Sequence, residues 1–187
     1  MPDPLLQLTI ALSLAALFGA AAIHKVLALA EWPSVVRNYR LFPEALAGVV
    51  AATLLCAEGL TAGALLWAPT RRAGACIAAA LLLGYAAAIG ANLRRGRTHI
   101  DCGCFGSRLR QGIAAWMVWR NLLLALLALT MLLPVSPRPL SPLEFAVAAV
   151  SAATLALLYP VLAVVARPPP PTYDANYHGT GRLPANH

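Results

Sequence analysis

The sequence predicts an all-α integral membrane protein in which four transmembrane helices form a bundle and a fifth transmembrane helix is added to it. Of the 187 residues, 60% are hydrophobic and 11% are charged, and the mean hydropathy of +0.71 lies outside the range of soluble domains. A bilayer core about 30 Å thick requires roughly 20 apolar residues of helix. Runs of about that length occur at 5–29, 45–68, 73–93, 113–133 and 145–166.

The net charge of +7 has a different meaning in such a chain than in a soluble protein, where it would suggest nucleic acid. Here the charge lies mainly in loops that meet anionic lipid head groups, so we expect the bilayer as a partner and no nucleic acid. The first apolar run follows Asp3 and no Lys or Arg. We therefore interpret it as a membrane helix and not as a signal peptide.

The first two apolar runs are separated by a short polar segment. The first run ends near His24 and Lys25, and Pro33 is expected to fix a turn after it. Residues 34–42 alternate apolar and polar positions at helical spacing, which predicts a short amphipathic helix at the membrane interface. The second run contains Gly59 and Gly63, a GxxxG pair that either lets another helix approach closely or arises by chance.

The remaining runs complete the domain organisation. The tight turn at 68–72 makes the second and third helices antiparallel neighbours, and the fourth helix follows a polar loop at 94–112. We assign 1–134 to the four-helix membrane bundle with this loop, and 135–166 to an additional transmembrane helix. The Pro-rich tail at 167–187 has too little apolar surface to fold, and we expect it to be disordered.

The loop at 94–112 carries the most reactive groups of the chain. Cys102 and Cys104 are separated only by Gly103, a spacing that a strained disulfide can bridge. Strained, exposed disulfides are the labile and catalytic ones. Arginines on both sides of the pair would lower the pKa of a thiol, which favours a redox dithiol. Cys56 and Cys76 lie within apolar runs, and we interpret them as small buried hydrophobes.

Two other interpretations of the cysteine loop stay open. The side chains of His99, Asp101, Cys102 and Cys104 are possible metal ligands, although structural zinc sites use a second Cys or His pair that this sequence does not supply. In the other interpretation, the two cysteines form a structural disulfide or remain as inert thiols. We favour the redox interpretation and expect no resident metal.

Polar residues within the apolar runs mark a second candidate site, because charged groups in a bilayer are costly and usually functional. His24 and Lys25 lie at the end of the first helix nearest the cysteine loop, and Glu58 lies deep in the second helix. Arg120 enters the fourth helix from the same side. It either forms a structural ion pair with Glu58 or organises a cavity in which Glu58 handles protons or a quinone.

Aromatic residues near these groups also have two interpretations. Tyr39, Tyr85 and Trp116 are first of all expected to anchor the helices in the bundle or at the membrane interface. A quinone pocket needs rings of the same kind, so these residues are the candidates for binding a quinone cofactor.

Several of these residues together resemble the methylamine utilisation protein MauE family, over roughly residues 10–133. The resemblance rests on His24-Lys25, Tyr39 with Pro43, Glu58, Gly96, the run from Asp101 to Gly106 and Arg120-Asn121. It implies thiol–disulfide exchange with a thioredoxin-like or exported partner protein. By analogy, the bundle with a loop dithiol is also similar to DsbB and vitamin K epoxide reductase, which pass electrons from thiols to quinone.

Carried over by residue, the resemblance implies a redox pair, Cys102 and Cys104, within a polar shell. The members of that shell are His24, Lys25, Glu58, Asp101 and Arg120. The predicted function is therefore a membrane thiol–disulfide oxidoreductase, with a membrane quinone as the candidate acceptor. The alternative is a non-catalytic membrane scaffold for the maturation of an exported protein, in which the loop is stapled by a disulfide or holds zinc.

The side of the membrane on which the loop lies receives two opposing predictions. The face of the bundle that carries the cysteines has ten Lys and Arg residues and the other face has three, which by the positive-inside rule puts the loop in the cytoplasm. The family resemblance and a disulfide-forming role imply the opposite side of the bacterial inner membrane. We adopt the second orientation as the expectation.

Overall fold

The computed structural model describes residues 3–98, 100, 112–135 and 138–165, with side chains only as far as residue 157. Every regular element within these ranges is helical, which confirms the all-α class. The α-helices are α1 (Pro4–Leu27), α2 (Trp32–Asn38), α3 (Ala47–Leu66), α4 (Arg71–Arg94), α5 (Ala115–Thr130) and α6 (Pro142–Val165). Two single 3-10 turns, Glu44–Leu46 and Ala68–Thr70, precede α3 and α4.

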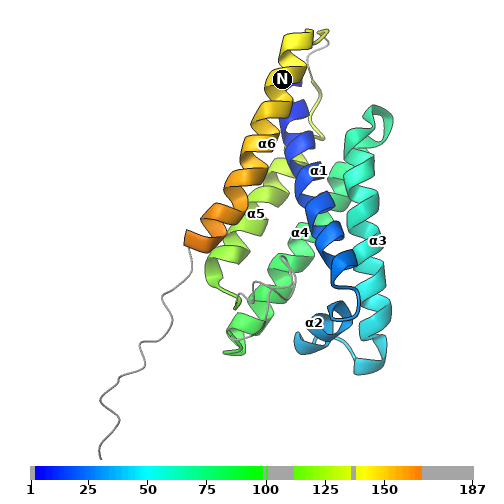
Figure 1. Cartoon of the computed structure of the whole chain (residues 1–187), viewed down its shortest axis with the longest axis vertical. Coiled ribbons are helices and arrows are strands. Elements are labelled where there is room, and N and C mark those ends of the chain that lie inside the picture. The colour runs from blue at the N-terminus through cyan, green and yellow to red at the C-terminus, as the bar shows by residue number, and fades with distance from the viewer. Residues whose placement is uncertain (1–2, 99, 101–111, 136–137, 166–187) are drawn as a thin grey trace, which may run out of the picture.

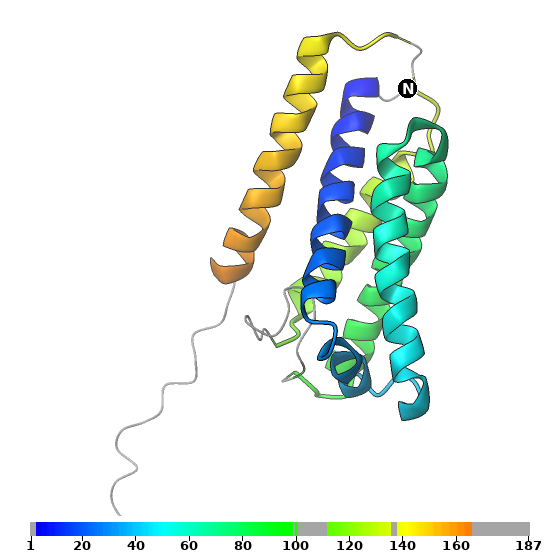
Figure 2. The same cartoon turned by 45° about the vertical axis from the view of Figure 1, so that its right-hand side comes forward.

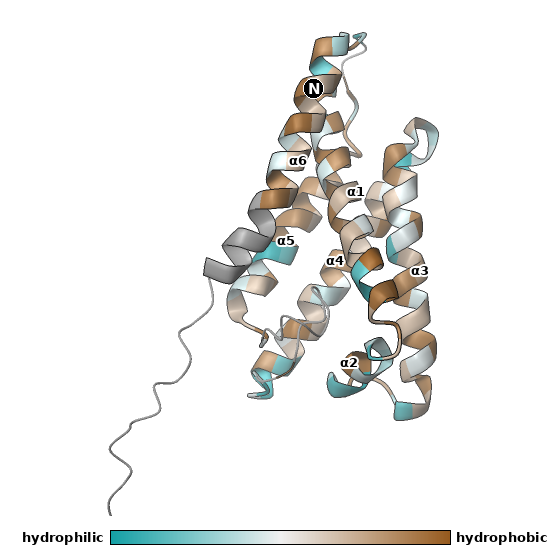
Figure 3. Cartoon of the chain, in the orientation of Figure 1, coloured by the Kyte–Doolittle hydropathy of each residue, from teal (hydrophilic) through white to brown (hydrophobic). Residues whose placement is uncertain are grey.

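Three segments are long and apolar enough to cross a membrane, and they agree with the first three predicted runs. They are Pro4–Leu27, Glu44–Leu66 and Ala68–Arg94. The helices α5 and α6 coincide with the fourth and fifth runs, and their described parts are shorter apolar helices. The chain is thus a multi-pass membrane protein. Figure 3 shows hydrophobic positions along α1 and α6 and hydrophilic positions on α2.

The main core lies between α1, α3, α4 and α5. The helix α1 packs against α3, α3 against α4, and α4 against α5, with a smaller contact between α5 and α1. Small residues of α4, such as Ala75 and Ala78, have no exposed surface, and Phe18 and Leu65 fill the space between the helices. The helix α6 lies outside this group along α1 (Figures 1 and 2).

The segment between α1 and α3 differs from the prediction in one respect. Pro33 does not form a separate turn but lies in the first turn of α2. Proline is tolerated there because the N–H groups of a first helical turn have no acceptor within the helix. The helix ends at Asn38, earlier than the predicted residue 42. Arg40 then adopts a left-handed conformation with a φ of 47°, which turns the chain towards α3. Trp32 fixes α2 to α3 by donating from Nε1 to the carbonyl of Ala51 at 2.9 Å.

Of the two interpretations of Gly59 and Gly63, the close approach of another helix does not occur within the described chain. A Cβ atom at either position would have no neighbour within 4 Å. The close approach lies instead at Gly74 of α4, where a Cβ atom would be 3.0 Å from the backbone nitrogen of Leu65. The GxxxG spacing carries no information on which face of a helix meets its neighbour.

The two cysteines of the apolar runs were also predicted wrongly. Cys56 and Cys76 are both exposed free thiols on the outer faces of α3 and α4, and they are not buried hydrophobes. A thiol is apolar enough to face lipid, so composition alone did not distinguish the inside of the bundle from its outside.

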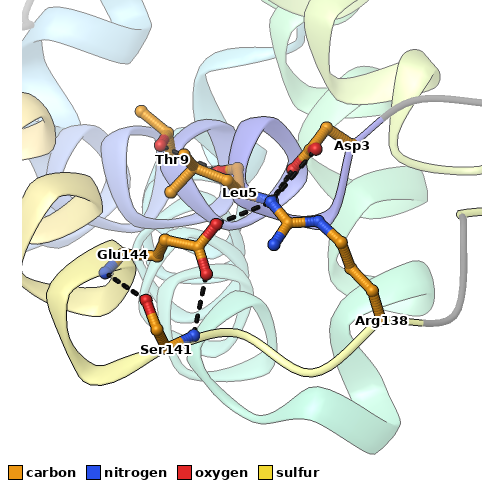
Figure 4. A network of polar contacts seen from close by, with 6 residues as sticks. All are labelled: Asp3, Leu5, Thr9, Arg138, Ser141 and Glu144. Atoms are coloured by element: carbon orange, nitrogen blue, oxygen red, sulfur yellow. Dashed lines mark hydrogen bonds and ion pairs between the residues drawn. The ribbon is translucent and has the colours of Figure 1, made fainter.

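One ionic cluster joins the start of α6 to the start of α1 (Figure 4). Nη2 of Arg138 donates to Asp3 Oδ1 at 3.0 Å and to Glu144 Oε1 at 2.6 Å. The second oxygen of Glu144 accepts from the backbone nitrogen of Ser141 at 2.7 Å. All three charged residues precede the apolar stretches of their helices. The cluster explains why α6 begins beside the N-terminus of α1.

The acidic side chains of this cluster titrate abnormally. The hydrogen bond from Arg138, followed by that from the Ser141 backbone, lowers the pKa of Glu144 to about 2. The backbone N–H of Leu5, followed by Arg138, lowers the pKa of Asp3. Depressed pKa values mean that these carboxylates stabilise the docked state above the pKa of the unfolded chain. Their contribution is lost as the pH falls through the depressed values.

We therefore expect the docking of α6 to weaken as the pH falls from about 4.5 towards 2. Hydrogen-exchange protection factors of the first two turns of α6, measured in lipid nanodiscs, should fall over this range relative to those of α3. The Arg138→Gln variant should show low protection at pH 7 and little further change on acidification. An equal pH dependence in the variant and the parent would rule out the cluster as the cause.

Candidate functional site

A buried ion pair lies inside the bundle, towards the end at which α1 terminates. Lys25, in the last turn of α1, is 5% exposed, and Glu58 of α3 is 1% exposed. Nζ of Lys25 donates to Oε1 of Glu58. Glu58 is eleven positions along α3 from Ala47, roughly 16 Å of helix. The pair is thus enclosed by protein at a depth where charges are otherwise excluded.

Two aromatic rings complete the surroundings of the lysine. The hydroxyl group of Tyr85, on α4, donates to the same Glu58 oxygen at 2.5 Å. Nζ of Lys25 lies 4.5 Å from the centre of the Trp32 ring and 5.4 Å from that of Tyr85. Cation–π attraction compensates in part for the water that the ammonium group has lost. The four residues form one contact group, which we call the Lys25 cluster: Lys25, Trp32, Glu58 and Tyr85.

One atom of the Lys25 cluster has an unused hydrogen-bonding capacity. Oε2 of Glu58 is buried and accepts no hydrogen bond from any residue that the structure describes. A buried carboxylate oxygen without a donor is costly, so such atoms in a membrane interior point to a proton, a water molecule or a ligand group as partner. Glu58 is therefore a candidate for proton exchange as well as a partner in the ion pair.

An apolar pocket of about 80 Å³ lies between α2, α3 and α4. Trp32 and Tyr85 line it and also contact the lysine ammonium group, so these two rings separate the pocket from the ion pair. Phe42, one of the lining residues, is 55% exposed. The other lining residues are Val35, Val36, Tyr39, Leu41, Val50, Leu54 and Ala88.

The base of the cysteine loop is closed by backbone contacts. The backbone nitrogen of Ile113 donates to the carbonyl of Ile100 at 3.1 Å. Gly112 lies so close to Thr98 that a Cβ atom would be 2.7 Å from the Thr98 carbonyl oxygen. Both isoleucines are buried, and Ile113 packs with Ile89 in a small second core. The described residues on either side of 101–111 therefore lie next to each other on the bundle.

Two loop arginines hold the base of the loop against α2. Nη2 of Arg97 donates to the carbonyl of Asn38 at 3.0 Å, and Nη1 lies 3.2 Å from Oδ1 of Asn92. Nη1 of Arg95 donates to the carbonyl of Arg40 at 3.4 Å. Asn38 is the last residue of α2 and Arg40 lies two residues beyond it, at the helix end where the dipole attracts positive charge. We call these contacts the arginine clamp, since they join the loop to α2.

The structure brings together some of the predicted site residues and separates others. Lys25, Glu58 and Tyr85 meet in the Lys25 cluster, and Tyr39 lines the pocket while it also packs against the second core. His24 is exposed, one position from Lys25 but outside the cluster. Asp101, Cys102 and Cys104, and with them His99, lie outside the described residues.

The helix α5, which corresponds to the fourth predicted transmembrane helix, differs most from the expectation. Of the two interpretations of Arg120, the ion pair with Glu58 does not form, because Glu58 pairs with Lys25. The guanidinium group of Arg120 lies instead 5.2 Å from the centre of the Trp116 ring. Trp116 packs in the second core and does not line the pocket with the two tyrosines. Spacing along a helix predicted the depth of these groups but not the direction in which they point.

Sequence reasoning missed Trp32, Asn92 and Arg97 as site residues. Asn92 is fully buried, and its Nδ2 donates to the carbonyl of Ala88 at 3.1 Å while Oδ1 accepts from Arg97. A signal was present in the sequence, because an amide seven residues after Tyr85 lies on the same face of the helix. Within the described residues no group of His, Cys, Asp and Glu is arranged to hold a metal ion.

The fold and these sites define a multi-pass helical membrane protein with a buried charge cluster near the base of a cysteine-bearing loop. The family model described as "Methylamine utilisation protein MauE" matches residues 3–134. The chain therefore belongs to the MauE family, which confirms the resemblance seen in the sequence.

Curated relatives of the same name span nearly the whole chain. The methylamine utilization protein MauE of Paracoccus denitrificans is 41% identical over 159 residues, which are 84% of this chain and 85% of the relative. That of Paracoccus versutus is 41% identical over 162 residues, 85% and 86% of the two chains. That of Methylorubrum extorquens is 37% identical over 162 residues, 85% and 87%. No solved structure matches the chain.

A double-mutant cycle tests whether Lys25 and Glu58 depend on each other. Each single variant, Lys25→Met or Glu58→Leu, leaves a buried charge unpaired and should lower the free energy of unfolding by about 3–5 kcal/mol. The double variant should recover most of that loss, because no charge remains buried. Unfolding free energies measured in mixed micelles give the coupling, and additive losses would show that the pair is not a unit.

Proposed function

We propose that this protein is a membrane thiol–disulfide oxidoreductase whose redox pair is Cys102 and Cys104. Its partner is a thioredoxin-like protein or an exported protein, and its electrons leave to an acceptor dissolved in the bilayer, for which a membrane quinone is the candidate. The printed names of the relatives link them to methylamine utilisation, and we propose the same process for this chain.

The observation that carries the proposal is the closed base of the loop. A Cys-Gly-Cys sequence lies between two chain ends that are hydrogen-bonded to each other at 3.1 Å and attached to α2 by the arginine clamp. A redox pair that must meet a partner protein needs such a fixed place outside the hydrocarbon core. The Lys25 cluster lies near the same end of the bundle, within the membrane part of the protein.

The proposed cycle transfers a disulfide to the partner. A thiolate of the partner attacks one sulfur of the oxidised Cys102–Cys104 pair, and the S–S bond breaks as a mixed disulfide forms. The second partner thiolate displaces that bond, so the partner is oxidised and the pair is left as a dithiol. Reoxidation by a quinone forms the S–S bond again, and two electrons and two protons convert the quinone to the quinol.

The polar shell has the role of handling those protons. Lys25 and Glu58 share a hydrogen bond inside the protein, and a carboxylate paired with an ammonium group can accept or release a proton without contact with water. His24, Asp101 and Arg120 stay in the proposal as residues that the family resemblance adds to this shell.

The arginine clamp bears on the orientation of the loop. Arg95 and Arg97 belong to the ten basic residues of the cysteine face, but both donate to backbone carbonyls at the end of α2. Because these two arginines stabilise the fold, their charges say little, under the positive-inside rule, about the side of the membrane on which the loop lies. We therefore propose that the loop faces the outside of the bacterial inner membrane.

Cysteine variants test the proposed activity. In proteoliposomes that contain a quinone, Cys102→Ser and Cys104→Ser should each abolish the oxidation of a dithiol substrate, because neither single thiol can close the disulfide. Cys56→Ser is the matched control, since Cys56 is exposed on the outer face of α3, and it should keep full activity. Retained activity in both loop variants, or stoichiometric zinc with no redox phenotype, would favour the scaffold alternative.

Thiol labelling of intact cells tests the orientation. In a variant without Cys56 and Cys76, a membrane-impermeant maleimide should label Cys102 and Cys104 only after the cells are treated with a reductant, since an outward-facing pair is held oxidised. Lysis without reduction should add no label. Labelling that requires lysis, with no need of a reductant, would put the loop in the cytoplasm.

A further inference from the structure

We propose that the pocket between α2, α3 and α4 binds the ring of a membrane quinone, and that Tyr85 delivers protons to it from the Lys25–Glu58 pair. The inference rests on the proposed oxidoreductase function, which needs an electron acceptor in the bilayer. It adds the place where that acceptor binds and the residues that serve it.

The position of the pocket determines how a ligand arrives. Its walls are apolar or aromatic, and Phe42, one of the lining residues, is 55% exposed on the surface of a membrane protein. A ligand that enters there comes from the lipid and not from water. A volume of about 80 Å³ is small for a complete lipid chain. It suits the edge of one flat ring whose hydrocarbon tail stays among the lipids.

The wall formed by Tyr85 distinguishes a quinone from a lipid chain. Tyr85 lines the pocket and donates its hydroxyl proton to Glu58 Oε1 at 2.5 Å, and Lys25 donates to the same oxygen. A hydrocarbon chain has no atom that could accept a hydrogen bond from the Tyr85 hydroxyl group. A quinone carbonyl accepts a hydrogen bond from a phenol, and on reduction each of its two oxygens takes up a proton.

The unused oxygen of Glu58 completes the proton path. When the Tyr85 hydroxyl group turns its hydrogen towards a bound carbonyl, Glu58 still accepts from Lys25 through Oε1. Oε2 of Glu58 accepts no hydrogen bond from the described residues, so it is available to take up the next proton. Lys25 is the proton source of the pair, and Tyr85 is its contact with the pocket. As its S–S bond forms, the dithiol gives up two electrons and two protons. The quinone takes up the two electrons, and two protons by way of Tyr85, and the protons released by the thiols balance those drawn from the Lys25–Glu58 pair.

Tyr39 and the segment that follows α2 connect the pocket to the base of the loop. Tyr39 lines the pocket, packs against the second core beneath the loop, and precedes the carbonyl that Arg95 holds. The pocket therefore lies beside the place where the cysteine stretch leaves the bundle.

Photolabelling of the whole protein in nanodiscs tests the site without any need for activity. A short-chain azidoquinone should label peptides of α2, α3 or α4, and unlabelled quinone should compete while an alkane of the same chain length should not. Leu54→Trp fills the pocket and should abolish labelling. Leu60→Trp, on the same helix but 72% exposed, is the matched control and should label normally. Labelling that survives Leu54→Trp, or competition by the alkane, would overturn the proposal.

Tyr85→Phe tests the proton step. This variant keeps the ring and loses the donor, so photolabelling should persist while the quinone reduction rate falls by roughly 100-fold. An unchanged rate would remove Tyr85 from the mechanism. The two proposals fail differently: loss of pocket labelling with cysteine-dependent thiol exchange intact refutes only the quinone site. Quinone reduction that survives Cys102→Ser and Cys104→Ser, with pocket labelling intact, refutes only the dithiol function.

Discussion

The ion pair between Lys25 and Glu58 is the interaction on which the interior of this protein depends. A single charge at this depth would cost several kcal/mol, so each partner makes the other tolerable. The pair also fixes geometry, because the lysine can reach Glu58 only if the last turn of α1 faces α3. Trp32 and Tyr85 then pack around the ammonium group. In this way two charges, unfavourable in themselves, specify how α1, α2, α3 and α4 meet.

Much of this arrangement was predictable because membranes constrain sequences strongly. The apolar runs predicted the ends of α1, α3, α4, α5 and α6 to within a few residues. The charged residues within those runs identified Lys25 and Glu58 as site residues. Each of these predictions needs only the position of a residue along the chain and its cost in lipid. The family was likewise predictable, because its motif consists of rare polar residues at fixed places.

Other features depend on directions that a one-dimensional pattern does not contain. The depth of Arg120 suggested Glu58 as its partner, but the rotation of α5 brings it over Trp116. Gly59 and Gly63 have the spacing of a helix contact, whereas the contact is made at Gly74. The contact between Arg97 and the carbonyl of Asn38 was likewise not predicted from the sequence. Such carbonyls become available only after α2 has ended there.

The arginine clamp has a consequence for how the two ends of the proposed reaction communicate. Because Arg97 holds both Asn38 and Asn92, the wall of the pocket and the base of the loop belong to one mechanical unit. A molecule seated against α2 and a protein docked on the loop then act on a common body. If the molecule in the pocket changes the affinity for the docked protein by some factor, the docked protein must change the affinity for that molecule by the same factor. Under the proposed function, an acceptor that binds more tightly in one redox state would thereby change the affinity for the partner protein.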